Sequence, residues 1–153
     1  MRQSYSNSAE VTLVFTVSTR KVAIAKDKGR ELTTRSKGWS IAHRLYRLNQ
    51  YLTGWCGYFA LMDTQSVFHE LDKWIRRRLR MGVWKDWKLS KTRKRKLVGF
   101  GVPRGKVYEW AYSRKSYWRI SGSPILKKTL DNSYWNRLGL CSLYQRYQYL
   151  HQS

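Results

Sequence analysis

The segments IAHRLYRLNQYLTGWCGYF (41–59) and SVFHELDKWIRRRLRMGVWKDWK (66–88), separated by a break at 62–64, decide the fold. Apolar residues of the first segment recur at steps of three and four, which places them on one side of a helix: Ile41, Leu45, Leu48, Leu52, Trp55 and Phe59. The second segment carries a comparable stripe: Phe68, Leu71, Ile75, Leu79 and Val83. We therefore expect two amphipathic helices that pack together.

The other side of these helices is strongly basic. From Lys73 to Lys96 the chain holds twelve Lys or Arg against one acid, Asp86. One carboxylate cannot neutralise so many cations, whereas a phosphate backbone offers negative charges at regular spacing, which Arg can hold in a bidentate fashion. The charge pattern therefore predicts a surface for nucleic acid.

Two glycines, Gly54 and Gly57, lie inside the first predicted helix. Each costs about 1 kcal/mol of helix stability relative to Ala. We expect close approach of the second helix to this backbone to compensate for that cost.

The composition of the whole chain points in the same direction. Its 153 residues contain 31 Lys or Arg and 9 Asp or Glu, a net charge of +22, together with eight Trp and eleven Tyr. Disordered basic tails are usually poor in aromatic residues, so this is the composition of a folded nucleic-acid binder.

No apolar run approaches the about twenty residues that span a bilayer. Cys56 and Cys141 stand far apart and suit reduced thiols in a cytoplasmic protein.

The two segments resemble the maturase-specific region, or domain X, of group II intron-encoded reverse transcriptases. LNQYLTGWCGYF (48–59) fits the family's L-N-x-Y-L-x-G-W-x-x-Y-F, and the LDKWIRRRLR helix fits its second motif, which ends W-K-x-W-K. Further matching positions follow: Thr92–Arg93, Val102–Pro103, Trp110, Ser113–Ile120, Ser123–Leu126 and Tyr134–Trp135. The resemblance extends from about Ser40 almost to the last residue.

The resemblance implies a mainly α fold: a thumb-like helical bundle with a small N-terminal β-hairpin and a small C-terminal helical lobe. We place a disordered start, hairpin and linker in 1–37, the maturase-specific thumb in 38–98, and a basic-aromatic, DNA-binding-like lobe in 99–153. The hairpin is expected from the β-branched runs Val11–Val17 and Lys21–Ala25, as a remnant of the polymerase palm. The fingers and most of the palm would then be absent. We expect several short helices in the C-terminal lobe.

The family's target is structured intron RNA, whose folding and splicing a maturase assists. The RNA-binding residues predicted here are Arg44, Arg47, Tyr51, Lys73, Arg76, Arg77, Arg78, Arg80, Lys85, Lys88, Arg93, Arg95 and Lys96. The DNA-binding residues predicted in the lobe are Arg114, Lys115, Tyr117, Trp118 and Arg119. For Tyr117 and Trp118, packing inside the lobe is an equally good interpretation.

Catalysis is not indicated. The family's polymerase signature, Tyr-x-Asp-Asp, is missing, and the closest acids, Glu70 and Asp72, project in different directions from one helix. The three histidines lie in no nucleophile motif. We expect no cofactor, no metal and no enzymatic activity.

Several alternatives stay open. The chain could be the thumb of a split reverse transcriptase, with a separate fingers-palm polypeptide as partner and target DNA bound during retrohoming. It could also be a generic basic RNA-binding protein, or a degenerate intron remnant. The sequence favours the maturase interpretation because its Trp, Gly and Arg positions agree in order and spacing.

Overall fold

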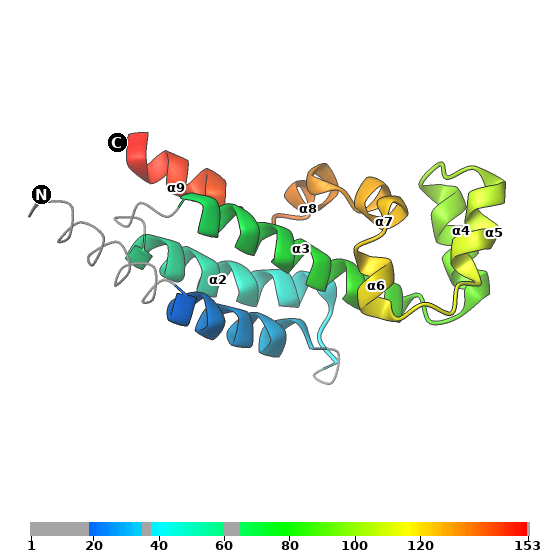
Figure 1. Ribbon diagram of the computed structural model, residues 1–153, viewed down its shortest axis with the longest axis horizontal. Coiled ribbons are helices and arrows are strands. Elements are labelled where there is room, and N and C mark those ends of the chain that lie inside the picture. The colour runs from blue at the N-terminus through cyan, green and yellow to red at the C-terminus, as the bar shows by residue number, and fades with distance from the viewer. Residues whose placement is uncertain (1–18, 35–37, 60–64, 153) are drawn as a thin grey trace, which may run out of the picture.

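The computed structural model describes residues 19–34, 38–59 and 65–152 (Figure 1). Residues 19–33 are helical and form what we call the first helix. The other elements are α2 (Ile41–Phe59), α3 (Gln65–Asp86), α4 (Ser90–Gly99), α5 (Arg104–Ala111), α6 (Tyr117–Ser121), α7 (Pro124–Thr129), α8 (Asn132–Arg137) and α9 (Leu143–Gln152). The mainly α prediction is confirmed, since these ranges contain helices and no strand.

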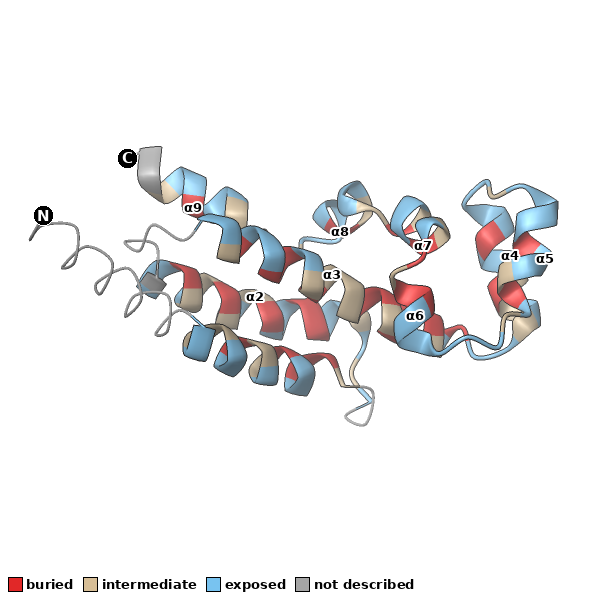
Figure 2. Ribbon diagram, viewed as in Figure 1, coloured by how far each residue is buried: buried red, intermediate tan, exposed pale blue. Residues whose placement is uncertain are grey.

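The core extends from the first helix through α2 and α3 to α9, and the predicted apolar stripes of α2 and α3 contribute to it (Figure 2). Leu48, Phe68 and Leu71 are completely or almost completely buried, and Trp55 meets Phe68 edge to face with ring centroids 5.5 Å apart. Burying each such side chain contributes about 1.5–3 kcal/mol, enough for these two helices to organise the domain. The break at 62–64 and the side chain of Phe59 lie outside the described residues.

The N-terminal β-hairpin prediction is not supported. Residues 21–25 belong to the first helix, and the Val11–Val17 run and the start predicted to be disordered lie outside the described residues. Ala25, Gly29 and Leu32 are buried at helical spacing, and a Cβ on Gly29 would lie 2.8 Å from the Trp74 ring of α3. The β propensity of a short Val and Ile run is weak, and packing against α3 overrides it.

The expected close approach at Gly54 and Gly57 is also wrong. Both glycines are exposed, and a Cβ at either position would meet open space. The glycine that does lie tightly against a neighbouring helix is Gly29. The apolar period therefore predicted the buried side of α2 correctly, but it could not assign a packing role to glycines on the opposite side.

The C-terminal helices return to the long pair. Helix α6 packs on α3, and α9 packs on both α2 and α3. The buried carboxylate of Asp72 accepts hydrogen bonds from the backbone N–H groups of Leu143 (2.8 Å) and Tyr144 (3.0 Å), so it caps α9 from a distant part of the sequence. Asn49 of α2 bonds Gly139 and Cys141 in the loop before α9.

Helices α4 and α5 form a hairpin at the end of α3 away from α9 (Figure 1). Most of their residues are exposed, apart from inward-facing positions such as Leu97 and Val107 (Figure 2). The division of the chain at residues 37/38 and 98/99 stays a prediction. Within the described ranges, no helix is both long enough and apolar enough to cross a bilayer.

Candidate nucleic-acid interface

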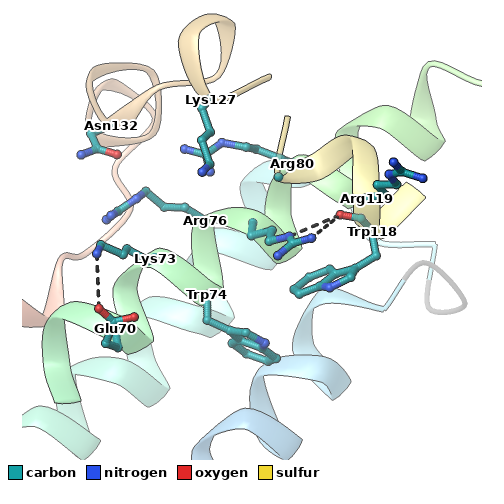
Figure 3. Close-up of a pocket in the computed structure, with 11 residues that line it drawn as sticks. Glu70, Lys73, Trp74, Arg76, Arg80, Trp118, Arg119, Lys127 and Asn132 are labelled. Atoms are coloured by element: carbon teal, nitrogen blue, oxygen red, sulfur yellow. Dashed lines mark hydrogen bonds and ion pairs between the residues drawn. The ribbon is translucent and has the colours of Figure 1, made fainter. Parts of the chain in front are cut away.

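An open groove of about 540 Å³ runs along α3, with α6, α7 and the start of α8 on its other side (Figure 3). Its cationic lining residues are Lys73, Arg76, Arg77, Arg80, Arg119 and Lys127. Trp74 and Trp118 provide aromatic surface, and Glu70, Gly122 and Asn132 complete the wall. We call this feature the basic groove.

Arg77 is held in place by groups from α6. Its Nη2 and Nε donate to the backbone carbonyl of Trp118 at 2.9 and 3.3 Å, and Nε also lies 3.3 Å from the Ser121 hydroxyl. The guanidinium lies 4.0 Å from the centre of the Trp118 ring, a cation–π contact that leaves part of both groups facing the groove.

Gly122 makes this arrangement possible. A Cβ at position 122 would lie 2.9 Å from Cζ of Arg77, closer than two such atoms can approach. Any other residue would therefore displace the guanidinium. The backbone of Gly122 has φ −92°, so the requirement comes from space and not from conformation.

Arg80 lies deeper in the groove. It is 6 % exposed, and its Nε donates to the carbonyl of Leu130 at 2.9 Å. Burial, followed by the nearby charge of Arg76, lowers its pKa to about 10, while Asp131 acts in the opposite direction. Burial likewise lowers the pKa of Arg76. Both groups remain charged at neutral pH, but their charge is poorly compensated, which favours an anion beside them.

Little protein charge balances these cations. Among the described residues that line the basic groove, Glu70 is the one carboxylate, and it pairs with Lys73 at 3.3 Å. Side chains of α3 and Lys127 of α7 converge on the same hollow (Figure 3). The arrangement suits phosphate oxygens, which can bridge several cationic donors at once.

The family model for the group II intron maturase-specific domain matches residues 22–98, which is half of the chain. The chain belongs to this family. A comparison with curated proteins finds no significant match. The match covers α2, α3 and most of both the first helix and α4, and it supports a role in group II intron splicing.

The residues matched by the maturase-specific family therefore form one wall of the basic groove, and residues after position 98 form the other. Lys73, Arg76, Arg77 and Arg80 lie within the matched range, whereas Lys127 lies beyond it. The sequence analysis included all four α3 residues among its RNA-binding candidates. It missed Lys127, Gly122 and Asn132, because their part in the groove depends on how α7 and α8 return to α3.

Besides Arg80, two of the residues predicted to bind RNA are buried, and these two do not line the basic groove. Arg44 is 3 % exposed and its Nη1 lies 3.8 Å from Asp86 Oδ2. Arg93 is 7 % exposed, donates to the Trp84 carbonyl at 3.2 Å, and lies 4.5 Å from the centre of a Trp84 ring. Because both are buried and neither lines the basic groove, we remove them from the proposed contact set.

The remaining predicted RNA-binding residues do not line the basic groove. Arg78 points toward the first helix, with Nε 3.2 Å from Thr33 Oγ1. Arg47 lies 5.9 Å from the centre of the Trp39 ring, and burial raises the pKa of the half-buried Tyr51. Lys85 lies 5.4 Å from the centre of the Tyr117 ring. Lys88, Arg95 and Lys96 are exposed.

The predicted DNA-binding residues are all exposed at the surface. Trp118 and Arg119 belong to the basic groove, while Lys115 lies 5.0 Å from the centre of the Trp110 ring. Tyr117 is 45 % exposed and Trp118 36 %, so neither is packed inside the lobe. The two surfaces predicted separately therefore meet at Trp118.

The described residues contain no group of three or more His, Cys, Asp or Glu side chains arranged to hold a metal ion. The matched family is that of a non-catalytic domain.

Proposed function

We propose that the chain is an RNA-binding maturase domain, and that the basic groove holds the phosphate backbone of structured group II intron RNA. The observation that carries this proposal is the excess of six cations over one paired carboxylate in a single groove. Protein groups hold Arg77 and Arg80 through neutral backbone carbonyls, which position the guanidiniums without neutralising them. A phosphate in the groove would therefore meet guanidinium charge that these carbonyls do not cancel.

The proposed task is to stabilise the folded intron while the RNA performs the cutting and joining. A groove lined from two sides contacts strands that are close in the folded RNA but distant in its sequence. Phosphate contacts then position the protein, and the shape of the RNA gives selectivity. This role needs no catalytic side chain.

Filter binding of the full chain to a group II intron RNA tests the proposal. We expect tight binding whose log affinity falls linearly with log salt as counterions are released. The variant Arg76→Gln/Lys127→Gln removes two groove charges and should lower the salt slope by about 2. Lys28→Gln, an exposed lysine of the first helix that pairs with Glu31, is the matched control and should change the slope less. Equal affinity for an unrelated duplex of the same length would contradict the proposed specificity.

A second candidate is the thumb of a split reverse transcriptase. The observation in its favour is a shallow, largely apolar hollow between the first helix and α2, lined by Lys21, Ile24, Tyr51, Tyr58 and neighbouring residues. Ile24 is 50 % exposed and Tyr58 is 74 % exposed. Such a patch would fit the apolar surface of a separate fingers-palm polypeptide.

Primer extension after mixing the chain with a fingers-palm polypeptide tests this second candidate. Restored synthesis that is lost in Ile24→Asp but kept in Arg76→Gln would support docking through the hollow. Absence of primer extension with an intact fingers-palm partner would contradict the split reverse transcriptase candidate. Retrohoming would further require Arg114, Lys115 and Tyr117 to contact target DNA, which a binding assay with a DNA duplex and Arg114→Gln would test.

A further inference from the structure

Two tyrosines on the α4–α5 hairpin present parallel rings at the protein surface. Tyr108 and Tyr112 lie four residues apart, their ring centroids are 6.1 Å apart, and their planes differ by only 7°. They are 51 % and 58 % exposed, whereas most of the chain's tryptophans are buried or half-buried. The α4–α5 hairpin therefore exposes flat aromatic surface that the core does not use.

Cations border these rings. Nζ of Lys94 lies 2.6 Å from the hydroxyl of Tyr108 and 4.3 Å from the centre of its ring. Arg104 lies one turn before Tyr108 on α5, so Arg104, Tyr108 and Tyr112 follow one line along the surface. The hydrogen bond from Lys94 and then its charge lower the pKa of Tyr108.

The sequence around these tyrosines is strongly basic. From Lys88 to Arg119 the sequence contains eleven Lys or Arg and a single acid, Glu109. That acid pairs with Lys106 at 3.5 Å. A basic partner would be repelled here, whereas a polyanion with flat rings matches both the charge and the exposed tyrosines.

We propose that Tyr108 and Tyr112 form a stacking platform for an unpaired nucleobase, with Lys94 and Arg104 contacting the adjoining phosphates of a single strand. A base inside a duplex has both faces covered by its neighbours, so the platform favours unpaired nucleotides. Base stacking on aromatic rings tolerates any sequence. Both tyrosines lie outside the matched range 22–98 and outside the basic groove, so this inference goes beyond the proposed function.

The test uses the full chain and single-stranded oligonucleotides that carry 2-aminopurine, made as RNA and as DNA. We expect 2-aminopurine fluorescence to be quenched on binding. The variants Tyr108→Leu and Tyr112→Leu should each reduce affinity roughly tenfold, while Tyr108→Phe, which keeps the ring, should retain quenching. The slope of log affinity against log salt should stay unchanged in the leucine variants, because no charge is lost.

Tyr149→Leu is the matched control, since Tyr149 is an even more exposed tyrosine on α9, and it should leave both affinity and quenching unchanged. The Arg76→Gln/Lys127→Gln variant separates this inference from the proposed function, because it should weaken binding of intron RNA while 2-aminopurine quenching remains. The proposal is overturned if both leucine variants remain folded by circular dichroism and keep wild-type affinity and quenching. Equal losses on a fully paired duplex would also overturn it.

Discussion

The carboxylate of Asp72 on α3 accepts the backbone N–H of Leu143 at 2.8 Å across 71 residues of sequence. The same carboxylate accepts the N–H of Tyr144 and the hydroxyl of Ser142, and it is almost completely buried. Together with the Ser142 hydroxyl, which accepts the N–H of Gln145, this side chain caps the first turn of α9, and it attaches α9 to the long helix pair.

Replacing Asp72 by Ala should cost about 2–4 kcal/mol of unfolding free energy, because three hydrogen bonds to a buried charge are lost together. Urea unfolding followed by circular dichroism measures the change. Asp131→Ala is the control, since Asp131 caps the short helix α8 through Tyr134 and acts on Arg80 only through its charge, so its loss should cost about 1 kcal/mol. Equal losses in the two variants would contradict the long-range role of Asp72.

Replacing Arg93 by Met should lower stability by about 1–3 kcal/mol, because the contact with Trp84 and the bond to its carbonyl are lost. Binding to intron RNA should keep its salt slope, since the buried guanidinium reaches no phosphate. A parallel titration of Arg95→Met, an exposed neighbour on α4, provides the comparison. A lower salt slope in Arg93→Met but not in Arg95→Met would show that Arg93 contacts RNA phosphates.

Gly122→Ala should weaken RNA binding without unfolding the protein. The new Cβ would displace the Arg77 guanidinium from the Trp118 carbonyl, but the backbone at position 122 accepts an L residue. We expect a loss of affinity close to that of Arg77→Gln, and little further loss when both changes are combined. Additive losses in the double variant would show that Gly122 acts through something other than Arg77.

Gly54→Ala and Gly57→Ala should each stabilise the protein by about 0.5–1 kcal/mol, since Ala is a better helix former and the added methyl group meets open space. Thermal unfolding measures this gain. Gly29→Ala should have the opposite sign, because its Cβ would lie 2.8 Å from the Trp74 ring. Destabilisation by Gly54→Ala would instead support the close approach of a second helix that the sequence predicted at this position.

Cys56 should resist thiol reagents at pH 8.5 until the protein unfolds, while the half-buried Cys141 should react earlier. Burial, followed by the charge of Cys141, raises the pKa of Cys56 from its ordinary 9.0 to about 11. The unfolded chain therefore releases this proton at lower pH than the folded one. The corresponding stability is present below pH 9 and is lost between pH 9 and pH 11.

Urea unfolding of wild type and Cys56→Ala across that pH range checks the linkage. The alanine variant should show a smaller loss of stability above pH 9, because its titrating group is gone. Identical pH dependence in the two proteins would contradict the assignment.

The sequence by itself determined the helical fold, the buried sides of α2 and α3, and the family. The spacing of Leu45, Leu48 and Leu52 sets a helical period, and a period is a local property that needs no knowledge of the partner. The same reasoning failed for residues 21–25, because a short β-branched run carries a weak preference that packing of Gly29 against Trp74 outweighs.

Only the tertiary structure decided which cations line the basic groove and which pack in the core. Arg76, Arg80 and Arg93 look alike in a basic run, yet Arg93 lies against Trp84 while Arg76 and Arg80 line the basic groove with Lys127. Burial of a charged side chain depends on which carbonyls and rings from distant segments pack against it. The carbonyl of Leu130, for example, accepts a hydrogen bond from Arg80. Helical periodicity contains no information about those long-range contacts, because they depend on how α6 to α9 pack against α3.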